Sequence, residues 1–134
     1  MPQEGSRRLR IHVLYTTPAQ TKTALQHAAK LSEGLDAEID LVLTPIVPFP
    51  LPVDRPPASL EFAQEEIRRL AELLDLDLRG YIYLCRDPLT MLESVLRPHS
   101  LLVMGFDKRL FFNRAARLAR ALRRRGHHVV TRIY

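Results

Sequence analysis

The chain has 134 residues, enough for one domain to bury a core without disulfides or metal ions. Hydrophobic residues make up 46% and charged residues 26%, as in an average globular domain, which excludes disorder of the whole chain. The formal net charge is +5, but residues 105–134 hold nine Lys or Arg against one acid, so the first 104 residues carry about −3. One C-terminal element therefore carries the basic excess.

The single cysteine bears on the compartment. Cys85 cannot form an internal disulfide and stands in an apolar run, which indicates a buried thiol in a reducing environment and makes a catalytic thiol the less favoured alternative. The first apolar run, Leu9–Tyr15, is interrupted by Arg10 and His12, so it is neither a signal-peptide core nor a membrane span. We expect a cytoplasmic protein without membrane insertion.

The first part of the chain alternates strand and helix patterns. Leu9–Tyr15 is rich in β-branched and aromatic residues and predicts a strand. Thr17 and Pro18 then predict the N-cap and first turn of a helix, whose apolar residues recur at helical spacing up to Gly34. Glu38–Thr44 predicts a second strand.

A proline-rich connection follows the second strand. Pro45–Pro57 holds six prolines in thirteen residues, which excludes a helix or a central strand. We expect an extended connection along the domain surface; a proline-rich ligand for another domain is the alternative. Ser59 then predicts the N-cap of a helix. Its apolar stripe consists of Leu60, Ala63, Ile67, Leu70, Ala71 and Leu74.

The next unit is a strand followed by a short helix. Leu78–Cys85 predicts the third strand, and Asp87 with Pro88 predicts an N-cap and a proline at the first helical position. Pro98 is expected to end this helix. Its predicted apolar face consists of Leu89, Leu92, Val95 and Leu96.

The fourth strand is the one around which the chain is organised. Ser100–Gly105 is apolar without polar alternation, which is typical of a strand covered on both faces of a parallel sheet. Asn113 can cap a last helix that ends at Gly126, and Val129–Tyr134 predicts a fifth strand. One face of that helix carries Arg114, Arg117, Arg120, Arg123 and Arg124.

This order of elements predicts an α/β fold with a five-stranded parallel sheet, doubly wound with helices on both faces, in one domain covering residues 1–134. Ligands of such sheets bind outside the carboxyl ends of central strands. The turn after Gly105 is therefore the expected place of a site.

Two local patterns carry a family resemblance. Arg86-Asp87-Pro88, a helix and then Leu101-Leu-Val-Met-Gly105 are similar to the Gly-Asp-Pro, helix and Leu-Ile-Val-Met-Gly pattern of the universal stress protein family. That family also makes its longest connection after strand two, and the order of elements resembles it over nearly the whole chain. The resemblance implies the fold shared with adenine-nucleotide hydrolases, and a homodimer.

The resemblance also implies a nucleotide site, which is degenerate here. Nucleotide-binding members carry an Asp at the end of strand one and a loop of the form Gly, two residues, Gly, nine residues, Gly, then Ser or Thr. Thr16 stands in place of the Asp, and Gly105 keeps the first glycine. Lys108 replaces the second glycine, while Asn113 and Arg114 replace the final pair. Side chains thus occupy positions that should present bare backbone to phosphates.

The resulting candidates for an anion or nucleotide are Thr16, Thr44, Gly105, Lys108, Asn113 and Arg114. Basic residues near a helix N-terminus would attract an anion, but a solvated turn is the favoured interpretation. We therefore expect no family-type ATP binding and no required cofactor. Binding of ATP or another adenine nucleotide remains the alternative.

Other constellations are weak. His127 and His128 are adjacent, so in a strand they point to opposite faces, and no metal site is expected. Glu65 and Glu66 cannot act as an acid/base pair across a substrate, and no nucleophile motif occurs, so no enzyme activity is expected.

The arginine face and the last strand suggest partners. The arginine face is either solvated or docks an acidic partner such as nucleic acid or an anionic membrane. Nucleic acid is not favoured, because no aromatic residues are interleaved with the arginines. An adaptor role for a transporter or kinase is a further alternative. A final strand with an unpaired edge predicts a symmetric homodimer through Val129–Tyr134.

Overall fold

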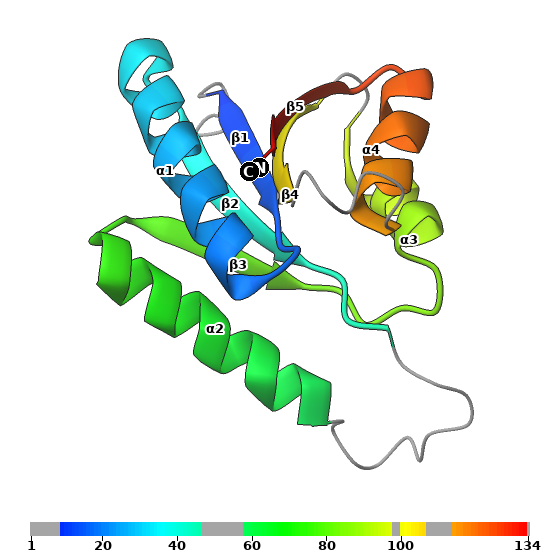
Figure 1. Cartoon of the computed structure of the whole chain (residues 1–134), viewed down its shortest axis with the longest axis horizontal. Helices are drawn as coiled ribbons and strands as arrows, with labels where there is room; N and C mark the ends of the chain where they lie inside the picture. Colours follow the sequence, from blue (N-terminus) through cyan, green and yellow to red (C-terminus); the bar gives the residue numbers. More distant parts are fainter. Residues whose placement is uncertain (1–8, 47–57, 98–99, 107–113, 134) are drawn as a thin grey trace, which may run out of the picture.

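Strands and helices alternate along the whole described chain, as the sequence predicts (Figure 1). The structure, a computed structural model, describes residues 9–46, 58–97, 100–106 and 114–133. Its elements are β1 (Arg10–Leu14), α1 (Pro18–Leu35), β2 (Glu38–Leu43), α2 (Ala58–Leu74), β3 (Leu78–Ile82), α3 (Pro88–Val95), β4 (Leu101–Phe106), α4 (Arg114–Arg124) and β5 (His128–Ile133).

The five strands form one sheet in the order β3-β2-β1-β4-β5, and each neighbouring pair is parallel. The chain runs outward from β1 to β3 and then returns to place β4 on the other side of β1. The strand order therefore reverses between β1 and β4, where doubly wound sheets open a crevice. The predicted fold class is confirmed.

Helices cover both faces of the sheet, because successive side chains of each strand point to opposite faces. Ile11 and Val13 of β1 pack in the core formed with α1 and α2, whereas Leu14 packs in the core formed with α3 and α4. Figure 1 shows these two pairs of helices on opposite sides of the central strands. The helix residues buried in these cores are Ala24, Leu25, Ala28, Ala63 and Leu70 on the first face, and Leu92, Ala119 and Leu122 on the second.

The predicted N-terminus of α1 is confirmed, whereas its C-terminus lies one residue later than predicted. Thr17 is the N-cap, and its hydroxyl accepts a hydrogen bond from the Gln20 backbone N–H at 3.3 Å. Gly34 does not end the helix, which continues to Leu35. Asp36 closes it in the left-handed region with φ of 50°, a conformation that Asp tolerates better than most residues.

Two other predicted boundaries are wrong. The helix α2 begins at Ala58, so Ser59 lies in its first turn and is not its N-cap. The third strand ends at Ile82 instead of Cys85, and Cys85 forms only an isolated bridge with Ile46. Pro45 interrupts the neighbouring chain there and, lacking an N–H, cannot continue the ladder.

Three further predictions meet the structure as follows. Cys85 is a buried free thiol, as expected. Val95 is 37% exposed, so it does not belong to the buried face of α3, where Leu92 is buried and Leu89 and Leu96 pack against the core. The fourth strand ends at Phe106, one residue beyond the predicted end at Gly105.

The last two elements are a helix and a strand, as predicted. The helix α4 is followed by Gly126 with φ of 95°, a region open to glycine, and β5 begins one residue earlier than predicted. Most of Pro45–Pro57, together with Asn113 and Tyr134, lies outside the described residues. No described helix combines the length and apolar content needed to cross a bilayer.

Candidate functional site

A cavity of about 520 Å³ opens at the carboxyl edge of the sheet, beside the ends of β1, β2 and β4. This is the crevice expected where the strand order reverses. Its lining is mostly apolar and comes from both helical layers. The lining residues are Leu14, Tyr15, Thr16, Thr17, Gln20, Leu43, Thr44, Pro45, Ile46, Phe62, Ala63, Pro88, Met104, Ala115 and Leu118.

The polar groups of Thr16 are satisfied inside the protein. Its hydroxyl donates to the backbone oxygen of Gly105 at 2.7 Å, which ties the end of β1 to β4. Its backbone N–H donates to the hydroxyl of Thr21 at 3.0 Å, and Thr21 is fully buried. The Thr16 side chain therefore links the end of β1 to β4 by a hydrogen bond. It brings no charge to the cavity, unlike a carboxylate at this position.

Gly105 is required by packing against α1. A Cβ at this position would lie 2.6 Å from the backbone oxygen of Gln20, closer than real Cβ atoms approach. In the family pattern, Gly105 corresponds to the first glycine of a phosphate-binding loop. The close crossing of α1 over β4 is by itself sufficient reason for a glycine here.

An aromatic pair forms one side of the cavity. The rings of Tyr15 and Phe62 meet edge to face, with centroids 6.4 Å apart and planes at 82°. The Tyr15 hydroxyl donates to Glu66 at 2.8 Å, so its ring is held in place from α2. Burial and the bond to Glu66 raise the pKa of Tyr15 well above its usual value. Phe62 is 54% exposed and gives the cavity an apolar rim.

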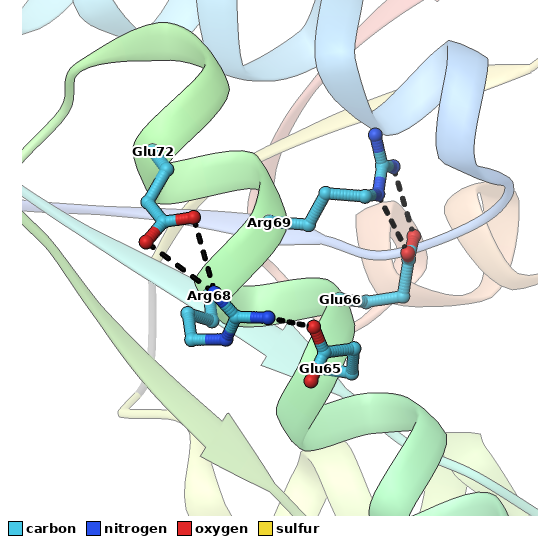
Figure 2. A network of polar contacts seen from close by, with 5 residues as sticks. All are labelled: Glu65, Glu66, Arg68, Arg69 and Glu72. Atoms are coloured by element: carbon cyan, nitrogen blue, oxygen red, sulfur yellow. Dashed lines mark hydrogen bonds and ion pairs between the residues drawn. The ribbon is translucent and has the colours of Figure 1, made fainter.

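Glu66 is held in turn by Arg69 of the same helix. Figure 2 shows the Arg69 guanidinium facing Glu66, with donor–acceptor distances of 2.8 and 3.1 Å. The hydrogen bond from Arg69, more than that from Tyr15, lowers the pKa of Glu66 despite its burial. This chain of contacts keeps Glu66 ionised as the acceptor for Tyr15.

The neighbouring carboxylate belongs to a different contact. Figure 2 shows Arg68 between Glu65 and Glu72, on the other side of α2 from Glu66. These pairs are exposed, so they add little to stability. Glu65 and Glu66 are thus separated by direction, as their spacing on a helix predicts.

The structure brings together three of the six predicted site residues. Thr16 and Thr44 line the cavity, and Gly105 accepts the hydrogen bond of Thr16. The backbone of Arg114 opens α4, but its side chain lies outside the description, as do Lys108 and Asn113 altogether. Among the described lining residues none is charged at neutral pH.

Sequence reasoning missed the aromatic wall and a second polar cluster. Asp40 is buried between Arg10, at 2.7 Å, and His12, at 3.6 Å, on neighbouring strands. Burial raises the pKa of Asp40 and lowers that of His12, whose Nδ1 has no hydrogen-bond partner. The alternation of side chains along strands could have indicated this cluster, because residues two apart share a face of the sheet. Arg10 pairs with Glu38 and His12 with Asp40 in the parallel register, which puts all four on one face.

Of the two adjacent histidines, His127 precedes β5 and has a structural role. His127 is buried, and its Nδ1 accepts a hydrogen bond from the Ser100 backbone N–H at 3.2 Å. Within the described ranges, no group of three His, Cys, Asp or Glu side chains is arranged to hold a metal ion.

Comparison with known proteins relates the chain to others through its structure. No protein-family profile matches the sequence, and no relative is found among curated proteins. A universal stress protein from Archaeoglobus fulgidus superposes with a TM-score of 0.66 at 14% identity, covering 92% of each chain.

Two ligand complexes are also similar. A structure of the universal stress protein from A. fulgidus in complex with dAMP gives a TM-score of 0.62 at 10% identity, over 92% of this chain and 96% of the other. A universal stress protein in complex with cAMP gives 0.53 at 12% identity, over 94% and 96%. At such identities the likeness shows the fold, as the family resemblance predicts.

Proposed function

We propose that this chain, which has the universal stress protein fold, is a non-catalytic regulatory domain that acts as a homodimer and does not hold ATP in the manner of nucleotide-binding family members. The observation that carries this proposal is the uncharged, mostly apolar lining of the cavity in the described residues. The cavity suits the uncharged, planar part of a ligand better than a triphosphate.

Three features support this preference. Thr16, in the place of the family's carboxylate, donates to a backbone oxygen and presents no charge to a ribose or a metal ion. Gly105 packs against α1, and the backbone of Gln20 occupies the space where a Cβ of residue 105 would lie, so this glycine has a packing role that needs no phosphate. Tyr15 and Phe62 form an aromatic wall, which favours a flat ring as the bound group. Burying a phosphate without paired charges would cost far more than the roughly 2–7 kcal/mol that an unpaired neutral polar group costs.

The same lining supports the non-catalytic part of the proposal. None of the described lining residues is a Ser, Cys, His, Asp, Glu or Lys. Of the lining residues that the structure describes, Tyr15 is the titratable one, and its raised pKa keeps it protonated at neutral pH. General acid–base catalysis works best with groups that titrate near the working pH, and Tyr15 does not.

Adenine-nucleotide binding is the second candidate function. The cavity lies at the carboxyl edge next to the first turns of α1 and α4, which is where anions gain from helix termini. Two proteins of the same fold were solved with dAMP and cAMP. Both are monophosphates, so a ligand with fewer charges than ATP is the more plausible nucleotide for this cavity.

Calorimetric titration with adenosine, AMP and ATP separates the two functions. The proposal expects ATP to bind no more tightly than adenosine, because the described cavity offers the phosphates no charged partner. The alternative expects each phosphate to increase the affinity. ATP binding at least tenfold tighter than adenosine would refute the proposal.

A matched pair of variants shows whether the heat of binding measured in these titrations comes from a ligand in this cavity. Ala115→Phe fills the cavity from α4, whereas Ala19→Phe adds the same side chain at an exposed position of α1 outside the lining. Binding of adenosine should be lost in the first variant and kept in the second. Loss in both variants, or in neither, would place the bound ligand elsewhere.

A further inference from the structure

One edge of β5 turns its backbone groups away from β4. Among the described strands, β5 is the last in the sheet order and pairs with β4 alone. The His128 backbone N–H donates to Ser100 O at 2.9 Å, so His128 faces β4. Alternate residues of a parallel strand face the same neighbour. Val129, Thr131 and Ile133 therefore direct their backbone groups to the open edge.

A side chain from α4 already occupies part of this edge. The guanidinium of Arg123 donates to the backbone oxygen of Val129 from Nη2 at 2.9 Å and from Nε at 3.3 Å. The same Nη2 lies 3.3 Å from the hydroxyl of Thr131. Arg123 is exposed, so these contacts cover the edge from the solvent side. The guanidinium thus donates to a backbone acceptor that an added strand would use, and a charged side chain at a sheet edge discourages pairing.

The self-pairing that uses all three outward residues needs this oxygen. In an antiparallel pair about a two-fold axis at Thr131, Val129 of one copy lies opposite Ile133 of the other, and each pair exchanges two hydrogen bonds. The Val129 oxygen must then accept from the Ile133 N–H of the second copy. An axis at Ile133 would leave Val129 unpaired and Arg123 in place, but it would use fewer strand hydrogen bonds.

We propose that Arg123 is an edge cap that controls pairing of β5 with a second copy of this chain. Pairing through the Thr131-centred register requires both copies to withdraw Arg123 from Val129. This inference rests on the proposed homodimer, since it names the residue that limits its formation. Because two caps open for each dimer formed, any effect of Arg123 on the association constant counts twice.

Sedimentation equilibrium of two variants tests the cap. Arg123→Met keeps the aliphatic stem and removes the donors. Arg120→Met removes the same charge from an exposed position one turn earlier, where the described contacts include none with β5. We expect the dimer association constant of Arg123→Met to exceed those of the wild type and Arg120→Met by at least tenfold. Backbone amides of Thr131 and Ile133 should exchange more slowly as this variant associates.

The possible failures are distinguishable. Equal association constants for the two variants would overturn control by Arg123 and leave the homodimer standing, since any common shift would come from reduced charge repulsion. Association without protection of the Thr131 and Ile133 amides would overturn pairing at this edge. If Arg123→Met does not associate at millimolar concentration, both the homodimer and its control by Arg123 are wrong.

Discussion

Replacing Gly105 by Ala is the sharpest test of the packing at the site. The added Cβ would lie 2.6 Å from Gln20 O and 3.2 Å from Gln20 C, both backbone atoms of α1. Backbone inside a helix cannot turn away as a side chain can, so α1 or β4 must shift. Thr16 donates to the oxygen of Gly105, so the shift would also strain that hydrogen bond.

The expected loss of stability follows from these two contacts. Overpacking of a tight core costs about 1–3 kcal/mol. Weakening one partly buried hydrogen bond costs about 1 kcal/mol. We expect Gly105→Ala to lower the free energy of unfolding by about 2–3 kcal/mol, measured by urea denaturation with an unchanged m-value.

Two other glycines provide graded controls. A Cβ at Gly34, near the end of α1, meets no atom within 4 Å, so Gly34→Ala should stabilise the protein by about 0.5–1 kcal/mol. At Gly80 the Cβ would meet three side-chain atoms of Ile67, Cδ1 at 2.5 Å, Cγ2 at 2.7 Å and Cγ1 at 2.9 Å, so this side chain must shift as a whole. Because a side chain shifts more easily than helix backbone, Gly80→Ala should fall in between. A loss below about 0.5 kcal/mol for Gly105→Ala would show that α1 moves freely and would refute the packing reason for this glycine.

Two predictions concern pH. The contacts of Glu66 lower its pKa in the folded state, so its ionised form stabilises the protein above its unfolded pKa, and this stability is lost as pH falls through the folded pKa. Glu66→Gln should lower the free energy of unfolding by about 1–2 kcal/mol at pH 7, and urea melts of this variant should lose less stability at acid pH than those of the wild type. Equal acid slopes in both proteins would contradict this. Burial lowers the pKa of His12 more than Asp40 raises it, so its contribution is present above pH 6.5 and falls below it, because the unfolded chain takes the proton first. The stability of His12→Gln should therefore fall less than that of the wild type between pH 7.5 and 5.5, and parallel curves would show that His12 does not titrate there.

Local pattern was enough for the architecture. Apolar runs such as Ser100–Gly105 and the helical stripe after Ser59 have different periods, and a chain that alternates them has few ways to bury both. The parallel sheet, the two helical layers and the place of the crevice followed from this alternation. Local pattern did not set every boundary, because the end of β3 depends on Pro45, which follows the neighbouring strand β2.

The meaning of individual residues at the site depended on contacts between distant parts of the chain. The sequence shows that Gly105 lacks a side chain, but only the crossing of α1 shows what fills the space. Tyr15 and Glu66 are 51 residues apart, and no periodicity connects them. Thr16 was placed correctly at the edge, but its hydrogen bond to Gly105 spans 89 residues.

The arginine face shows the same division. By sequence alone, Arg123 is one of five arginines on a single helical face, and spacing does not distinguish it from the other four, whether the face is solvated or docks an acidic partner. In the structure, Arg123 donates to the β5 edge. Amino-acid sequence determined the elements and their layers, because periodicity and burial are local properties that add along a chain. Tertiary structure decided which side chains meet, because hydrogen bonds and close contacts depend on atomic positions that only the complete packing sets.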